Sequence, residues 1–205
     1  MSAPIREDLL RQPGEGSEAE TPERDPRPRL PAPECSPLPA GPLPDDAACV
    51  RLWDQCAMPG HIREHCARVA DAAGFLAERA AAARLFPDTA DADLIAAVRA
   101  AGLLHDLAKD YCIRHGGSHA QLGGAWTAVL TGIPALAQGV LFHVWWPWNV
   151  DPLRHFLPLA VLYADKRVRY TEFVSLGGRF SDLFERYGAT PERRARIGMS
   201  LKQAQ

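Results

Sequence analysis

Residues 91–109 read DADLIAAVRAAGLLHDLAK, and this stretch decides the fold. Its apolar side chains recur at intervals of three and four residues, which predicts a helix over 91–108 with one buried face. That face consists of Leu94, Ala97, Val98, Ala101 and Leu104. At the end of the apolar run the chemistry changes, because His105 and Asp106 follow directly. The stretch therefore predicts a packed helical core with a polar pair at its edge.

The same spacing predicts further helices along the rest of the chain. They are expected over residues 60–85, 118–130, 135–144, 152–170, 181–187 and 191–202. Pro59 is expected in the first turn of the first of these, and Thr190 as the cap of the last, with Pro191 as its first residue. Period-two alternation is absent beyond a few residues, as are Asn-Gly and Asp-Gly hairpin turns. The sequence predicts an all-α bundle of about six to seven helices.

The first 45 residues differ in composition from the rest. They hold eleven of the 18 prolines and no aromatic residue. Residues 1–46 carry five basic and ten acidic side chains, a balance of -5, whereas the other 159 residues carry 18 and 15, a balance of +3. Such a segment buries too little apolar surface to offset its ordering entropy. We expect a disordered acidic tail over 1–45, either a passive extension or a docking peptide, and one domain over 46–205.

Composition and motifs also exclude several classes of protein. Neither a Gly-rich dinucleotide motif nor a P-loop is present. The first 18 residues lack the apolar stretch of a secretory signal, and the most apolar window, 133–150, contains His143 and two prolines, which argues against a membrane span. Five cysteines without a CxxC pair indicate free thiols in a reducing compartment. We expect a cytoplasmic protein that binds neither nucleic acid nor membrane.

Side chains that can bind a cation occur on five of the predicted helices. They are His65, His105, Asp106, His119, His143 and Asp165. Each alone is compatible with a hydrogen-bonded core residue, and Asp165 with neutralisation by Lys166 or Arg167. Brought together without a cation, the two carboxylates would remain unbalanced like charges. The whole set therefore predicts a metal centre.

The order and setting of these residues resemble the HD superfamily of metal-dependent phosphohydrolases. Residues 103–109 are similar to that family's signature helix end, 65–69 to its first motif and 163–167 to its last. The resemblance covers about residues 50–190. His119 and His143 fall between the second and last motifs, as in the two-metal branch, which includes HD-GYP phosphodiesterases and bacterial diadenosine tetraphosphate hydrolases. The GYP signature is absent, which disfavours cyclic-di-GMP as substrate.

The resemblance implies a role for each of these residues. It implies one metal held by His65, His105, Asp106 and Asp165. It implies a second metal, shared through Asp106 and completed by His119 and His143. Asp106 and Lys109 would be the catalytic residues, Lys109 through contact with a substrate phosphate.

This ligand set suits phosphate chemistry. Nitrogen-rich ligation favours iron or manganese, with cobalt, nickel or zinc as alternatives, over magnesium. Two divalent ions can supply hydroxide near neutral pH and stabilise charge on phosphoryl oxygens. We therefore expect a metal-dependent hydrolase that cleaves a phosphate ester or phosphoanhydride of a small molecule, with a nucleotide as the favoured substrate.

Basic and aromatic side chains near this set are candidates for substrate binding, namely Lys109, Arg114, Arg167 and Trp145. Arginine can hold phosphate in a forked geometry, and tryptophan can stack on a nucleobase. Surface solubility for the arginines and packing under a loop for Trp145 are the alternatives. His61 is expected outside the ligand set, and His115 and His155 at the surface.

Two other functions fit the same residues. One is a mixed-valent di-iron oxygenase of the HD type, since some HD-like proteins use these ligands for oxygen chemistry. The other is a non-catalytic nucleotide-sensing module with the tail as a docking arm. The sequence leaves open the exact substrate, the metal and the oligomeric state, for which a homodimer is one alternative.

Overall fold

The structure is a computed structural model that describes residues 31–39 and 41–205, and it is helical almost throughout. The all-α fold is confirmed. A single short antiparallel hairpin, β1 (Val168–Arg169) and β2 (Glu172–Phe173), interrupts the helices of this part of the chain. The helices are α1 (Asp46–Gln55), α2 (Gly60–Ala82), α3 (Asp91–Leu104), α4 (Lys109–His115), α5 (His119–Thr131), α6 (Pro134–Phe142), α7 (Phe156–Arg167), α8 (Leu176–Tyr187) and α9 (Pro191–Ala204).

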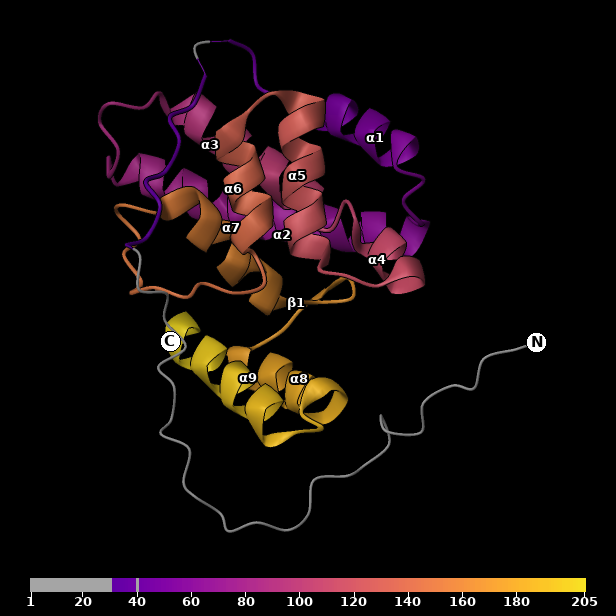
Figure 1. Cartoon of the computed structure of the whole chain (residues 1–205). Helices are drawn as coiled ribbons and strands as arrows, with labels where there is room; N and C mark the ends of the chain where they lie inside the picture. Colours follow the sequence, from indigo (N-terminus) through magenta and orange to yellow (C-terminus); the bar gives the residue numbers. More distant parts are fainter. Residues whose placement is uncertain (1–30, 40) are drawn as a thin grey trace, which may run out of the picture.

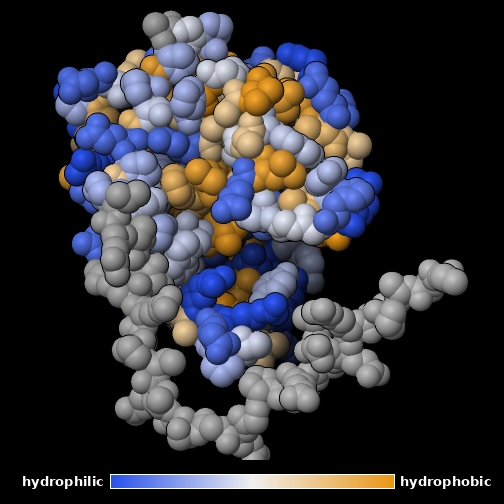
Figure 2. Space-filling view, viewed as in Figure 1, coloured by the Kyte–Doolittle hydropathy of each residue, from blue (hydrophilic) through white to orange (hydrophobic). Residues whose placement is uncertain are grey.

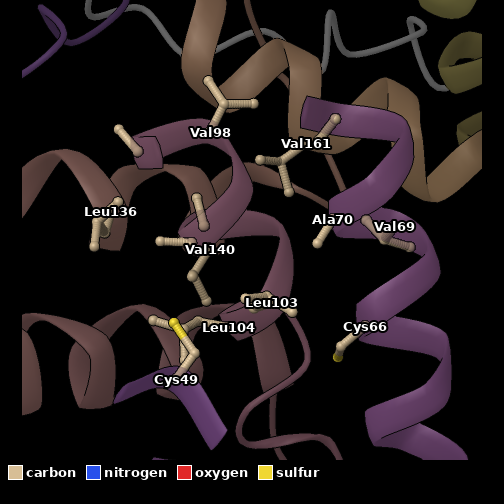
Figure 3. Close-up of a cluster of buried hydrophobic side chains, with 14 of the residues drawn as sticks. Cys49, Cys66, Val69, Ala70, Val98, Leu103, Leu104, Leu136, Val140 and Val161 are labelled. Carbon is tan, nitrogen blue, oxygen red and sulfur yellow. The ribbon is translucent and has the colours of Figure 1, made fainter. Parts of the chain in front are cut away.

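The core forms where four of these helices meet. Helix α2 packs along α3, and α6 and α7 close the cluster from the other side (Figure 1). Figure 3 shows buried side chains from all four helices in contact, among them Ala70, Leu104, Val140 and Val161. Helices α8 and α9 pair with each other below this bundle and are joined to it through the β1–β2 hairpin (Figure 1). None of the helices described here has the length and hydrophobicity that a bilayer crossing requires.

The close approach of α2 and α3 depends on a glycine. A Cβ atom added at Gly102 would lie 2.8 Å from the Cα atom of Ala70, which is backbone and cannot move aside alone. Small residues therefore line both sides of this contact. The approach brings His65 on α2 and His105 at the end of α3 to the same end of the bundle, with ring centroids 5.3 Å apart.

Several predicted boundaries differ from the structure for identifiable reasons. The helix predicted over 91–108 ends at Leu104, because Leu107 and Lys109 donate to carbonyls three residues earlier and tighten the chain into a turn. The helix predicted to reach residue 170 ends at Arg167, where the hairpin begins. Pro59 lies at the N-cap rather than in the first turn. Helices α1 and α4 were not predicted.

Part of the proline-rich segment packs on the domain. Gln138 of α6 accepts a hydrogen bond from the Ser36 amide at 2.8 Å and donates one to the Glu34 carbonyl at 2.9 Å. Leu38 packs against the core. Contacts with the domain therefore begin before the expected boundary at residue 46. Residues 1–30 and 40, where most of the predicted tail falls, lie outside the described residues.

We predict that Gly102→Ala lowers the free energy of unfolding by about 1–3 kcal/mol, because the new methyl group overpacks the α2–α3 contact. Gly74→Ala is the matched control, since Gly74 is also buried within a helix but has open space around its Cβ position. There, the better helix propensity of alanine should stabilise the protein by up to about 1 kcal/mol. Urea unfolding measures both. Equal stability of the two variants would contradict the close-approach interpretation.

Candidate metal centre

Six cation-binding side chains meet at one end of the bundle. They come from α2, the turn after α3, the start of α5, the C-cap of α6, and α7: His65, His105, Asp106, His119, His143 and Asp165. All but His119 are buried, with exposed fractions between 0% and 8%. Residues up to 100 positions apart in the sequence thus share one buried polar cluster. The structure brings together all six residues that the sequence singled out.

One half of the cluster is centred between α2, α3 and α7. His65 Nε2 lies 3.2 Å from Asp165 Oδ1, and His105 Nε2 lies 3.9 Å from the same oxygen. Asp106 Oδ2 lies 3.3 Å from His105 Nε2 and 3.8 Å from His65 Nε2. His65, His105 and Asp165 are close enough to bind one cation jointly, and Asp106 Oδ2 lies beside two of them.

The other half of the cluster is centred on Asp106 Oδ1. Asp106 Oδ1 lies 3.4 Å from His119 Nε2 and 3.6 Å from His143 Nε2. The two imidazole Nε2 atoms are 3.2 Å apart. This trio is also close enough to bind a cation. Asp106 therefore presents one oxygen to each half.

Backbone carbonyls fix the orientation of three of the imidazole rings. His65 Nδ1 donates to the Tyr170 carbonyl at 2.8 Å, and His105 Nδ1 donates to the Gly102 carbonyl at 2.8 Å. His143 Nδ1 donates to the Val140 carbonyl at 2.6 Å. Because a carbonyl can only accept, the ring proton belongs on Nδ1, and the Nε2 lone pair faces the cluster. This is the arrangement that metal-binding histidines require.

An unpaired nitrogen tests whether the cluster fits a metal ion. His105 Nε2 is fully buried and has no hydrogen-bond partner among the described residues, although Asp106 lies nearby. A buried acceptor left in this way is costly unless a cation or proton satisfies it. Cys66 also lies close to His105 and Asp106, and burial raises the pKa of its thiol well above the ordinary value. The residues present fit a site for metal ions with nitrogen and oxygen ligands.

Both carboxylates stay ionised in spite of their burial. Burial by itself raises the pKa of Asp106, but nearby His105, His143 and Lys109 outweigh it and hold this pKa well below the ordinary value. Lys109 Nζ donates to Asp106 Oδ2 at 2.6 Å. Burial is likewise outweighed at Asp165, whose pKa is lowered well below the ordinary value by Lys166 and the histidines. The two carboxylates therefore contribute negative charge to the site, next to the positive charges of Lys109 and Lys166.

A cavity of about 480 Å³ lies beside the cluster, between the bundle and the α8–α9 pair. In Figure 2 the surface on this side is hollowed between the main helical body and the largely hydrophilic α8–α9 pair. The cavity wall includes four cationic side chains, Lys109, Lys166, Arg179 and Arg196. It also includes large apolar side chains, among them Trp145, Phe180 and Tyr187. A small anionic molecule with an apolar part fits such a lining.

Only two of the four residues predicted to bind substrate lie in the wall of this cavity. Lys109 and Trp145 line the cavity. Arg114 is exposed and forms an ion pair with Asp110 at 2.5 Å, and Arg167 donates to the Val174 carbonyl and the Tyr163 hydroxyl. Neither arginine is part of the cavity wall that the structure describes.

Arg179 was not singled out by the sequence analysis, although a signal for it exists. It falls on the same face of α8 as two apolar residues, three positions after Leu176 and four before Leu183. His155 was expected at the surface, and that prediction was wrong. Its ring is buried against Trp146, with centroids 4.8 Å apart, because the loop after α6 folds over the start of α7.

No protein-family model, curated protein or solved structure matches this chain. The helical fold and the buried histidine–aspartate clusters are compatible with an HD-like fold. The geometry of the cluster itself therefore carries the functional interpretation.

We predict that the metal-free protein loses stability as the pH falls from 7.5 to 5. Burial, together with the neighbouring His143, lowers the pKa of His119 to about 4. The pKa of an unfolded histidine is about 6.5. At pH 5 the residue is therefore mostly protonated in the unfolded state and mostly neutral in the folded state. The free energy of unfolding should fall by at most about 2 kcal/mol from this group, with a contribution of the same sign from His143.

Urea unfolding of chelator-treated protein at both pH values measures this loss. His119→Asn should flatten the pH dependence, whereas His115→Asn, which alters an exposed histidine, should retain it. An unchanged slope in His119→Asn would show that this imidazole does not resist protonation.

Proposed function

We propose that this protein is a metal-dependent phosphohydrolase of the HD type that uses two divalent ions. The observation that carries the proposal is the division of Asp106 between the two halves of the cluster. Its Oδ2 faces His105 and His65, and its Oδ1 faces His119 and His143. A carboxylate in this position is suited to bridge two cations.

Each ion would have its own protein ligands. Those of the first would be His65, His105, Asp106 and Asp165, and those of the second Asp106, His119 and His143. Two divalent ions bound there would supply hydroxide at neutral pH and Lewis acidity toward phosphoryl oxygens. Four imidazoles against two carboxylates favour iron or manganese over magnesium.

The surrounding side chains support a small phosphorylated substrate. Lys109 Nζ, held on Asp106 and half-exposed to the cavity, is positioned to receive a phosphate oxygen. Lys166 Nζ lies 2.8 Å from Asp165 Oδ2, which fixes that carboxylate and keeps it ionised. Trp145 offers an indole in the same cavity against which a nucleobase could stack. A nucleotide therefore fits the proposal best.

We predict that Asp106→Ala reduces bound metal to well below one ion per chain, because both halves of the cluster lose their shared oxygen ligand. His119→Ala should retain about one ion and His143→Ala likewise, since each loses a ligand of one half only. Elemental analysis of the purified proteins measures this, with His115→Ala as the control at an exposed position. Two ions per chain in both His119→Ala and His143→Ala would exclude the second site.

A phosphate-release screen with a panel of nucleotides tests the reaction. Asp106→Ala should lower turnover by about 10³-fold or more, since it removes the organising group of the site, while circular dichroism should show intact helices. An iron-loaded protein that consumes oxygen and releases no phosphate would instead favour the di-iron oxygenase.

A further inference from the structure

Arg179 is a largely enclosed cation whose surroundings do not account for it. It lies on α8, which packs against α7, and its side chain is only 13% exposed. Arg179 forms part of the wall of the cavity beside the candidate metal centre. Buried arginines normally have their hydrogen-bond donors paired, so the partners of each nitrogen are informative.

The guanidinium has one edge engaged and one edge without a hydrogen-bond partner among the described residues. Nη1 donates to Asp182 Oδ2 at 3.3 Å. Nε is buried and has no hydrogen-bond partner among the described residues, and Nη2 lies 3.9 Å from Asp165 Oδ1, beyond hydrogen-bond distance. Nε and Nη2 together form the side of a guanidinium that binds two oxygens of one oxyanion in parallel.

The need to neutralise Asp165 does not explain why Arg179 lies beside it. Lys166 Nζ already contacts Asp165 Oδ2 at 2.8 Å, and His65 Nε2 lies 3.2 Å from Oδ1. Because Asp165 Oδ1 belongs to the candidate metal cluster and lies 3.9 Å from Arg179 Nη2, the unpaired edge of Arg179 lies at the border of the cluster.

We propose that Arg179 binds two oxygens of the substrate phosphoryl group through Nε and Nη2, a role that rests on the proposed function. Lys109 then approaches the phosphoryl group from the Asp106 side of the centre, and Arg179 from the Asp165 side. Arg179 is therefore a substrate-binding residue supplied by the α8–α9 pair, and this pair is part of the active site rather than an appendage to the bundle.

Calorimetric binding of inorganic phosphate to the metal-loaded full chain tests this role without requiring turnover. Arg179→Met should weaken phosphate binding by about 10- to 100-fold, the range expected for charge-assisted hydrogen bonds. Arg179→Lys, which keeps the charge but not the fork, should recover part of the affinity. Metal content should remain that of the unaltered protein in both variants.

Arg186→Met is the matched control. Arg186 lies on the same helix and donates to the same Asp182, at 2.9 Å, but it is not part of the described cavity wall. Its replacement should change phosphate affinity by less than about threefold. If Arg179 only held α8 in place through Asp182, the two substitutions would act alike.

The outcomes separate the two proposals. Any one of four results would overturn the role of Arg179. Two concern affinity: Arg179→Met binds phosphate as well as the unaltered protein, or Arg186→Met weakens binding equally. The other two are loss of metal in both Arg179 variants and absence of phosphate binding to the unaltered protein. Phosphate binding that depends on Arg179 in a protein that hydrolyses no phosphate ester would overturn only the proposed function. Melting curves identify a variant that fails to fold, and Arg179→Lys then decides the question.

Discussion

The interaction on which the structure depends is the burial of the Asp106 carboxylate, which is 1% exposed at the meeting point of the helices. An ionised carboxylate in such a place is strongly unfavourable unless cations surround it. Lys109 supplies one positive charge at 2.6 Å, and four imidazole nitrogens lie 3.3 to 3.8 Å away. Lysine alone would balance the charge, but it would leave the inward lone pairs of the histidines unused. Metal ions bound there would use the carboxylate and the lone pairs together.

The helical packing serves this arrangement. The ligands come from segments that approach one another only because small residues line the contact between α2 and α3, where Gly102 leaves no space for a side chain. The same glycine supplies the carbonyl that orients the His105 ring. On α7, the chain turns into the hairpin directly after the cluster, and Tyr170, with φ at 56°, directs its carbonyl to His65. At Gly102, helix packing and the orientation of the His105 ring therefore depend on the same residue.

Periodicity predicted most of the fold because the buried faces of α2 and α3 are long and regular. Helix α4 has seven residues and begins immediately after a turn, too short for a period to show. The six clustered residues could be found because cation-binding groups beside apolar runs are conspicuous. Their pairwise distances could not be predicted, since these depend on helix crossing. Arg179 was missed because it lies far along the chain from every motif, although a charge on the same face of α8 as two apolar residues is itself a signal.

The charges around the centre indicate what kind of molecule it accepts. Three carboxylates, those of Asp106, Asp165 and Asp182, lie beside three cations, those of Lys109, Lys166 and Arg179, so the protein charges there balance. Metal ions bound at the cluster would create a positive excess, and burial would make that excess costly to leave unbalanced. An anion of more than one charge, entering from the cavity, would offset it. A phosphoryl group supplies that charge in the compact form that the Nε–Nη2 edge of Arg179 can bind.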